Sequence, residues 1–272
     1  MMYVIAVANQ KGGVGKTTTS INLAAGLSLA GSRVLLIDLD PQGNATMGSG
    51  VDKHALETSI YDWLLEGIAL SQVARATQAG YRLLPANSDL TAAEVRLMDE
   101  EGREQRLRQR LAEVADDFDY VLIDCPPSLN ILTLNALMAA QGVLVPMQCE
   151  YYALEGISAL QETVAAVQGH GNPELEIEGI LRTMYDPRNG LTREVSRQLI
   201  SHFGDRVFRT VIPRNIRLAE APSHGLPAML YDRQSRGAIA YLALAGELKR
   251  RHAKRSEAAV APPVTNPEDS SS

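Results

Sequence analysis

A glycine-rich loop between an apolar run and an amphipathic segment constrains the fold of this chain more than any other feature. Residues 4–19 read VIAVANQKGGVGKTTT. The β-branched run Val4–Val7 is typical of a buried strand, and the spacing over 17–30 predicts a helix. Glycines without a Cβ let backbone N–H groups turn toward an anion, and the following helix presents its unpaired N–H groups to the same place. The sequence therefore predicts a strand, a phosphate-binding loop and a helix.

The end of the loop, GKT, matches the pattern of nucleotide-binding P-loops. Lys16 supplies a point charge for the β- and γ-phosphates, and the hydroxyl of Thr17 is placed to ligate Mg²⁺. The start of the loop departs from the usual pattern, because Gln10 occupies the place of the first glycine and a second lysine, Lys11, follows it. A glycine-rich turn with two solvated lysines is the alternative, and the flanking strand and helix argue against it.

This KGGVGKT form resembles the deviant P-loop of the ParA/MinD family of ATPases. The resemblance implies that Lys11 reaches across a dimer interface to the phosphates of the partner's nucleotide, and that Lys11 and Lys16 are both catalytic. It also implies ATP and Mg²⁺ as cofactors. The residues of this loop expected to bind the nucleotide are Lys11, Gly12, Gly13, Val14, Gly15, Lys16, Thr17 and Thr18.

Two further apolar runs predict buried strands over 33–38 and 120–124, and acidic residues stand where each run ends. Asp38 and Asp40 belong to the first run and the loop after it, and Asp124 ends the second run. The carboxyl ends of parallel strands form the edge where open α/β sheets bind ligands. Carboxylates there can hold magnesium or orient an attacking water. An Asx-Pro turn capped by glycine is the alternative for the first pair.

The loops after both runs resemble the switch segments of ParA-type ATPases. DLDPQGN resembles switch I, and CPPSLN, which follows Asp124, resembles switch II. This resemblance makes Asp40 the catalytic residue that positions the attacking water. It makes Thr17, Asp38 and Asp124 the residues on the magnesium side.

The adenine base is expected between two segments from the second half of the chain. Met184 ends a strand predicted over 177–184, and VIPRNIRLAEAPSHG from Val211 resembles the other wall of the family's adenine pocket. We assign Pro213 and Asn215 to that wall, since a proline packs on a base and an amide can satisfy its edge. Without the resemblance, a Pro-Arg-Asn loop reads as an ordinary turn.

Charge is distributed unevenly along the chain. The net charge is −6, yet residues 181–255 hold 15 Lys and Arg against 6 Asp and Glu, and the remainder has a balance of −15. Such asymmetry points to an anionic partner, although a charge run alone favours a solvated helix face by about two to one. Arg188 and Arg217 match positions where ParA/Soj-type proteins carry DNA-binding arginines, which implies binding to double-stranded DNA without sequence preference. Arginines with less support are Arg193, Arg197, Arg214, Arg233 and Arg236.

The resemblance extends from about Tyr3 to Leu248 and implies a doubly wound α/β fold, with a mostly parallel sheet and helices on both faces. Composition favours one ATPase domain over 1–257, followed by a Pro- and Ser-rich tail over 258–272 that is expected to be disordered. Helices are also predicted over 59–65, 88–115 and 232–258.

The sequence has no run of eighteen apolar residues and no signal peptide, so a soluble cytoplasmic protein without membrane contact is expected. Cys125 and Cys149 lack CxxC spacing and are expected to be buried thiols. The resemblance implies a chromosome or plasmid partition ATPase. It would form an ATP-bound homodimer on nucleoid DNA and hydrolyse ATP when a ParB/Spo0J-type partner stimulates it. The alternatives are a MinD-like membrane-positioning ATPase, which the weak apolar face of the last helix disfavours, and a ParA-like cargo-positioning ATPase.

Overall fold

One eight-stranded sheet organises the chain in the computed structural model, which describes residues 2–260. The strands are β1 (Tyr3–Val7), β2 (Val34–Asp38), β3 (Arg75–Ala76), β4 (Arg82–Leu84), β5 (Tyr120–Asp124), β6 (Gly142–Gln148), β7 (Glu176–Tyr185) and β8 (Val207–Pro213). Their order is β3-β4-β2-β5-β1-β6-β7-β8, and every neighbouring pair is parallel except β3 and β4. The expected doubly wound, mostly parallel α/β fold is therefore confirmed.

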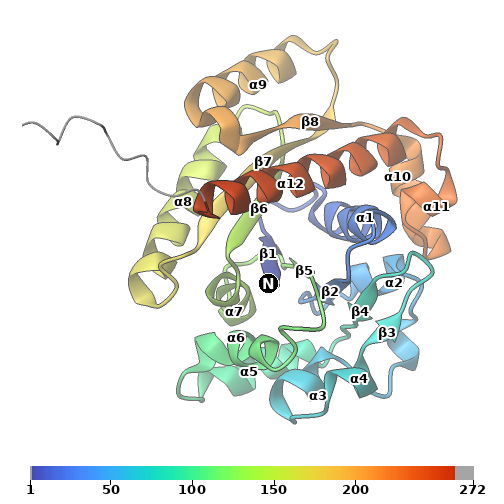
Figure 1. The fold of residues 1–272 in the computed structure, drawn as a ribbon, viewed down its shortest axis with the longest axis vertical. Helices are drawn as coiled ribbons and strands as arrows, with labels where there is room; N and C mark the ends of the chain where they lie inside the picture. Colours follow the sequence, from blue (N-terminus) through green and yellow to red (C-terminus); the bar gives the residue numbers. More distant parts are fainter. Residues whose placement is uncertain (1, 261–272) are drawn as a thin grey trace, which may run out of the picture.

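Helices cover both faces of this sheet (Figure 1). The α-helices are α1 (Lys16–Leu29), α2 (Asn44–Gly48), α3 (Ile60–Leu65), α4 (Leu70–Val73), α5 (Leu90–Met98), α6 (Arg106–Ala112), α7 (Ile131–Ala139), α8 (Ala153–His170), α9 (Gly190–Phe203), α10 (Ile216–Glu220), α11 (Ala228–Tyr231) and α12 (Arg236–Val260). The 3₁₀ turns are η1 (Lys53–Ala55), η2 (Arg103–Gln105), η3 (Gly204–Arg206) and η4 (Ala221–His224). Helices α1 and α12 lie on one face, and α7 and α8 lie on the other.

The central strand β1 supplies side chains to two separate cores, because successive residues of a strand point to opposite faces. Val4 and Ala6 pack in the core under α7 and α8. Ile5 and Val7 pack in the core under α1 and α12. Burial on both faces explains why the strand reads as a continuous apolar run and not as an alternating one.

Helix α1, which follows the glycine-rich loop, is fixed to the sheet by α12. The hydroxyls of Thr19 and Tyr241 lie 3.0 Å apart in the buried interface between the two helices. Gly26 lets the helices approach closely, since a Cβ added there would lie 2.9 Å from the Cβ of Ala245. The position of the loop therefore depends on a long helix from the far end of the chain.

Several local predictions are confirmed. Ser59 caps α3 with a reciprocal capping box to Asp62, and Trp63 is fully buried. Cys125 and Cys149 are buried free thiols.

The predicted long helix over 88–115 is wrong. The segment divides into α5, the turn η2 and α6, and Asp89 is the N-cap residue of α5. Helix α5 ends at Met98 with Asp99 as its C-cap, and Gly102 then adopts a left-handed φ of 69°, which a single helix continuing into α6 would exclude.

The last helix also has different bounds from those expected. It begins at Arg236, since Asp232–Ser235 forms a turn in which the backbone N–H of Ser235 donates to the carbonyl of Asp232 (3.1 Å). It continues to Val260, past the expected end of the domain at 257. The rest of the predicted disordered tail, 261–272, lies outside the described residues.

Gly26→Ala should destabilise the protein by about 1–3 kcal/mol, because the new methyl group would overpack the contact between α1 and α12. Gly156→Ala in α8 is the matched control, since nothing lies within 4 Å of its added Cβ. For Gly156→Ala we expect the free energy of unfolding to stay the same or to rise by about 0.5–1 kcal/mol, because alanine has the higher helix propensity. Urea unfolding of both variants measures the difference, and equal stabilities would contradict the packing described for α1.

Candidate nucleotide-binding site

The glycine-rich loop joins β1 to α1 at the carboxyl edge of the sheet. Gly15 occupies the N-cap position of α1 in a left-handed conformation (φ 91°), and no side chain caps the helix there. The N–H groups of the first turn therefore remain available to an anion. Lys16 is buried, its Nζ donates to the carbonyl of Lys11 (3.3 Å), and burial lowers the pKa of its ammonium group.

Two side chains from distant strands hold the loop in place. The hydroxyl of Thr183 in β7 donates to the carbonyl of Val14 (2.8 Å). The Nε2 of Gln148 in β6 donates to the carbonyl of Gly13 (3.1 Å). Neither residue is recognisable from the sequence, since only the pairing of β1, β6 and β7 brings them to the loop.

Asp38 and Asp124 lie side by side, because the register of β2 and β5 pairs these two residues. Both are fully buried. Burial raises the pKa of the Asp124 carboxyl, and the neighbouring charge of Asp38 raises it further. Such a pair is stable in the ionised form only with strong donors or a cation beside it.

Asp124 has an oxygen that a cation would satisfy. Its Oδ1 accepts a hydrogen bond from the hydroxyl of Ser20 (2.8 Å). Its Oδ2 is buried without a hydrogen-bond partner among the described residues. The Thr17 side chain is close enough to lower the pKa of this carboxyl. A hydroxyl and a carboxylate oxygen are ligands of the kind that Mg²⁺ prefers, so Thr17 and Asp124 fit the expected metal site.

Asp38 makes contacts that the sequence did not indicate. Its Oδ2 accepts from both the N–H and the hydroxyl of Thr46 (2.7 Å each), and its Oδ1 accepts from the N–H of Asp40 (3.3 Å). These bonds fix the loop after β2, so Asp38 acts in this structure as a positioning residue. Its role beside magnesium remains a prediction.

Asp40 is half-buried at the end of this fixed loop. The charge of Asp40 raises the pKa of the Asp124 carboxyl. It also acts to raise the pKa of the Lys16 ammonium group, but burial of that group has the larger, opposite effect, so the pKa of Lys16 is lowered overall. The structure therefore brings Asp40 near both the P-loop lysine and the magnesium candidate. A carboxylate in this place can orient a water toward the outermost phosphate.

Lys11 lies on the outer side of the loop, where its side chain is 54% exposed. Its Nζ forms an ion pair of 2.5 Å with Glu150 in the turn after β6. We predicted no role for Glu150 from the sequence. Its position could have been noticed, because residues 148–156 (QCEYYALEG) begin at the end of β6, at the same edge of the sheet as the P-loop.

The three adenine candidates come from neighbouring strand ends. The register of β7 and β8 pairs Tyr185 with Pro213, which places Pro213 near Met184. Met184 has a positive φ of 47°, which is rare for a side chain of this size, and its sulfur accepts from Gln148 Nε2 (2.8 Å). The Oδ1 of Asn215 caps α10 by accepting from the N–H of Arg217 (2.9 Å). Because the Oδ1 of Asn215 is used in this cap, the NH₂ group of its side chain is the part that would contact the edge of the base.

Arg188 and Arg217 follow β7 and β8, the last two strands of the sheet. Both are exposed, and both form ion pairs within the chain: Arg188 with Asp186, and Arg217 with Glu220 and Asp232. The local surface is therefore less positive than a count of arginines indicates. Exposed pairs of this kind are weak, so a phosphate can compete for either guanidinium.

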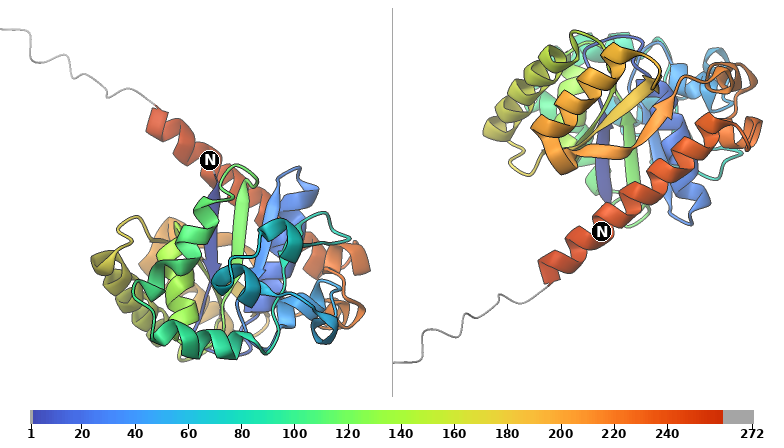
Figure 2. Two further views of the ribbon diagram at one scale, coloured as in Figure 1. Left: turned by 90° about the horizontal axis from the view of Figure 1, so that it is seen from below. Right: turned by 90° about the horizontal axis from the view of Figure 1, so that it is seen from above.

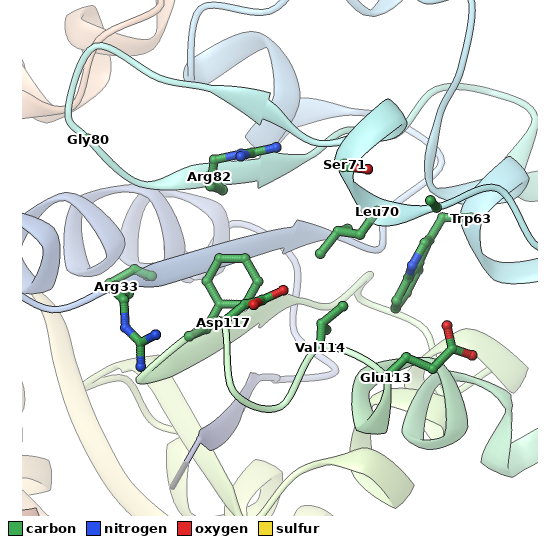
Figure 3. Close-up of a pocket in the computed structure, with 12 residues that line it drawn as sticks. Arg33, Trp63, Leu70, Ser71, Gly80, Arg82, Glu113, Val114 and Asp117 are labelled. Atoms are coloured by element: carbon green, nitrogen blue, oxygen red, sulfur yellow. The ribbon is translucent and has the colours of Figure 1, made fainter.

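A separate cavity of about 540 Å³ lies at the opposite edge of the sheet (Figure 3). Trp63, Leu70 and Val114 stand on one side of it, and Arg33 and Arg82 stand on the other. Arg33 is already bound to Asp119 by two guanidinium hydrogen bonds. The cavity lies at the amino ends of β2 and β4, whereas open α/β sheets bind ligands at the carboxyl ends of their strands. This cavity is therefore separate from the candidate nucleotide site.

Among the described helices, none combines the length and the apolar composition needed to cross a bilayer.

Replacement of Asp124 by Asn should change how stability depends on pH when no metal is present. The raised pKa means that the folded state binds a proton more tightly than the unfolded state. The contribution of this carboxyl to stability therefore falls as pH rises from about 4 toward its folded pKa, by at most about 1.4 kcal/mol per pH unit. In urea unfolding at several pH values, the stability of the wild type relative to Asp124→Asn should fall over this range, and parallel profiles would contradict the raised pKa of the buried carboxylate pair.

Comparison with known proteins is consistent with this geometry. The family model described as an AAA domain matches residues 2–177. The Bacillus subtilis protein named sporulation initiation inhibitor protein Soj is 52% identical over 249 residues, which cover 91% of this chain and 98% of that protein. The Caulobacter vibrioides chromosome partitioning protein ParA is 48% identical over 257 residues, which cover 93% and 96%.

Solved structures are similar over most of the chain. A Mycobacterium smegmatis protein, named cobyrinic acid a,c-diamide synthase and solved with ADP and magnesium, is 42% identical, has a TM-score of 0.83, and matches over 94% of this chain and 97% of its own. The Pyrococcus horikoshii septum site-determining protein MinD, in complex with Mg-ADP, shares the fold with a TM-score of 0.77 at 24% identity, over 94% of this chain and 99% of its own. With a P-loop, buried strand-end carboxylates and these relatives, the chain belongs to the ParA/Soj family of P-loop ATPases.

Proposed function

We propose that this protein is a DNA partition ATPase whose ATP-bound homodimer binds DNA without sequence preference and hydrolyses ATP on stimulation by a ParB-type partner. The observation that carries the proposal is the arrangement at one sheet edge. A buried lysine (Lys16) and a carboxylate (Asp124), one oxygen of which has no hydrogen-bond partner within residues 2–260, lie beside an exposed second lysine (Lys11). The names of the Bacillus and Caulobacter relatives support the same function.

In this proposal the nucleotide is ATP with Mg²⁺. Backbone N–H groups of the P-loop and of the first turn of α1 hold the β- and γ-phosphates, together with Lys16. Thr17 and Asp124 hold the metal ion, which neutralises phosphate charge when it is bound. Met184, Pro213 and the NH₂ group of Asn215 surround the base. Asp40 orients the attacking water.

Lys11 links two protomers by contacting the phosphates of the partner's nucleotide. In the single chain it pairs with Glu150, and both side chains are about half exposed. An exposed ion pair contributes little, about 0–1 kcal/mol. A triphosphate carries more negative charge than the single carboxylate of Glu150, so Lys11 can exchange Glu150 for the partner's phosphates. That exchange would favour the dimer.

The dimer brings two sets of basic side chains onto DNA. Arg188 and Arg217 stand after adjacent strands, so each protomer presents both from the same edge of the sheet. Contacts to phosphates give affinity that is independent of base sequence and sensitive to salt. The protein would therefore be cytoplasmic and associated with the nucleoid.

A membrane role has less support, because most large apolar side chains of α12 are buried inside the protein, with Ile239 as an exposed exception. Tyr241, Leu244 and Leu248 are buried against α1 and the sheet. From Arg251 to Ala259 the sequence has no large apolar residue with which to enter a bilayer.

Asp40→Ala should remove the residue that positions water while leaving the phosphate and metal contacts in place. We expect hydrolysis to fall by about 10²-fold or more, since proton transfer and water orientation are worth about 10²–10⁴. The variant should persist as an ATP-bound dimer on DNA. Phosphate release and DNA retention measure the two effects, and normal turnover would overturn the assignment.

Arg217→Glu should weaken binding to every DNA sequence while leaving ATP-dependent dimerisation intact. Arg206→Glu is the matched control, because Arg206 is exposed before β8, at the opposite edge of the sheet. Loss of a phosphate contact should also lower the salt dependence of binding, by about 0.9 in the logarithmic slope. Equal DNA retention of both variants at moderate salt would exclude Arg217 as a contact.

A further inference from the structure

A groove of about 990 Å³ lies beside the nucleotide site, between α5, α7 and α8. This volume is at the upper end of the range for ligand pockets, about 300–1,000 Å³. Met98 in α5 and Leu129 before α7 are exposed, at 63% and 52%. The apolar part of the lining comes mainly from Met98, Leu129, Ile131, Leu134, Met138 and Val167.

Acidic side chains surround this apolar surface. Glu94, Glu104 and Glu162 line the groove, against one arginine, Arg103. The guanidinium of Arg103 is directed to the backbone, since it donates to the carbonyl of Met98. The groove therefore combines an apolar floor with a negative rim, which suits an amphipathic segment with apolar and basic faces.

The groove is connected to the nucleotide site by two segments. Gln10, which directly precedes Lys11, lines it, and so do Leu129 and Asn130 from the loop after β5. Asn130 caps α7 with its Oδ1, and its Nδ2 donates to Glu94 (2.7 Å). An occupant would thus touch both the P-loop and the segment that carries the resemblance to switch II.

Other occupants fit less well. The described end of α12 packs on the face of the sheet opposite α7 and α8, and its Arg255 donates to the Tyr3 hydroxyl at the start of β1 (3.2 Å) (Figure 2). A second copy related by two-fold symmetry would bring Glu94, Glu104 and Glu162 toward their own equivalents. That contact would oppose like charges.

We propose that a basic, amphipathic helical segment of the partner protein docks in this groove and acts on hydrolysis through Leu129, Asn130 and Gln10. The proposal rests on the proposed function, since it locates the site of the ParB-type activator. Docking can shift the switch segment only if the segment binds one of its conformations more tightly. The hydrogen bond between Asn130 and Glu94 would be made in one of these conformations and broken in the other, so a segment docked beside it would bind the two with different affinities.

The first experiment uses a defined probe on the full chain. The probe is a labelled helical peptide of about 16 residues, about 24 Å long, with leucines on one face and lysines on the other. Two substitutions at exposed positions block the groove: Ala166→Trp fills it, and Glu162→Arg reverses part of its rim. The matched controls are Ala165→Trp, one position away on α8, and Glu174→Arg, which is exposed outside the groove.

We expect saturable binding of the peptide to the wild type and both controls, and at least tenfold weaker binding to both groove variants. A peptide with glutamates in place of the lysines should bind at least tenfold more weakly to the wild type. Absence of saturable binding to the wild type, or equal loss in the controls, would overturn the proposal.

The second experiment measures ATP hydrolysis with a ParB-type protein and DNA. The groove variants should lose at least tenfold of the stimulation while they keep basal hydrolysis and ATP-dependent DNA retention, and the controls should be stimulated normally. Full stimulation of Ala166→Trp and Glu162→Arg would overturn the groove as the docking site. Failure of the wild type to dimerise with ATP or to bind DNA would instead overturn the proposed function, and peptide binding would still decide the groove.

Discussion

Two carboxylates buried side by side at the ends of β2 and β5 are the constraint on which the rest of the site depends. The register of two parallel strands brings Asp38 and Asp124 together, and the sheet cannot separate them without a shift in that register. Buried carboxylates are costly unless donors or a cation compensate them. The neighbouring elements are arranged to supply that compensation, with Ser20 from α1 and Thr46 from α2.

The two acids have different partners and therefore different roles. One oxygen of Asp38 accepts a hydrogen bond from Asp40 in the loop after β2, and the other accepts two from Thr46 in α2, so both ends of this loop are fixed. Asp124 keeps one oxygen without a partner among the described side and main chains, beside the helix that begins with Lys16. One acid thus orders the protein, and the other fits the site proposed for a metal ion. Because the two acids are neighbours, a cation bound at Asp124 would lie close to the loop that carries Asp40.

The sequence predicted the parts of the site that are continuous in the chain. The P-loop, the aspartates at the ends of two apolar runs and the parallel sheet are visible because local pattern fixes them. Glu150, Gln148 and Thr183 were missed, because they reach the loop only through the pairing of distant strands. The long helix predicted over 88–115 was wrong, because the chain turns after Met98 and Gly102 adopts a left-handed backbone, which the helical composition of the segment does not reveal. The ion pairs of Arg188 and Arg217 likewise depend on how the turns fold.

The central claim is that a triphosphate is held from two sides, by its own P-loop and by the lysine of a second protomer. Sedimentation velocity of the purified protein, with magnesium and a non-hydrolysable ATP analogue, tests this claim most directly. The account predicts a dimer for the wild type and a monomer for Lys11→Ala at the same concentration. A wild-type protein that stays monomeric, or a Lys11→Ala variant that dimerises equally well, would contradict it.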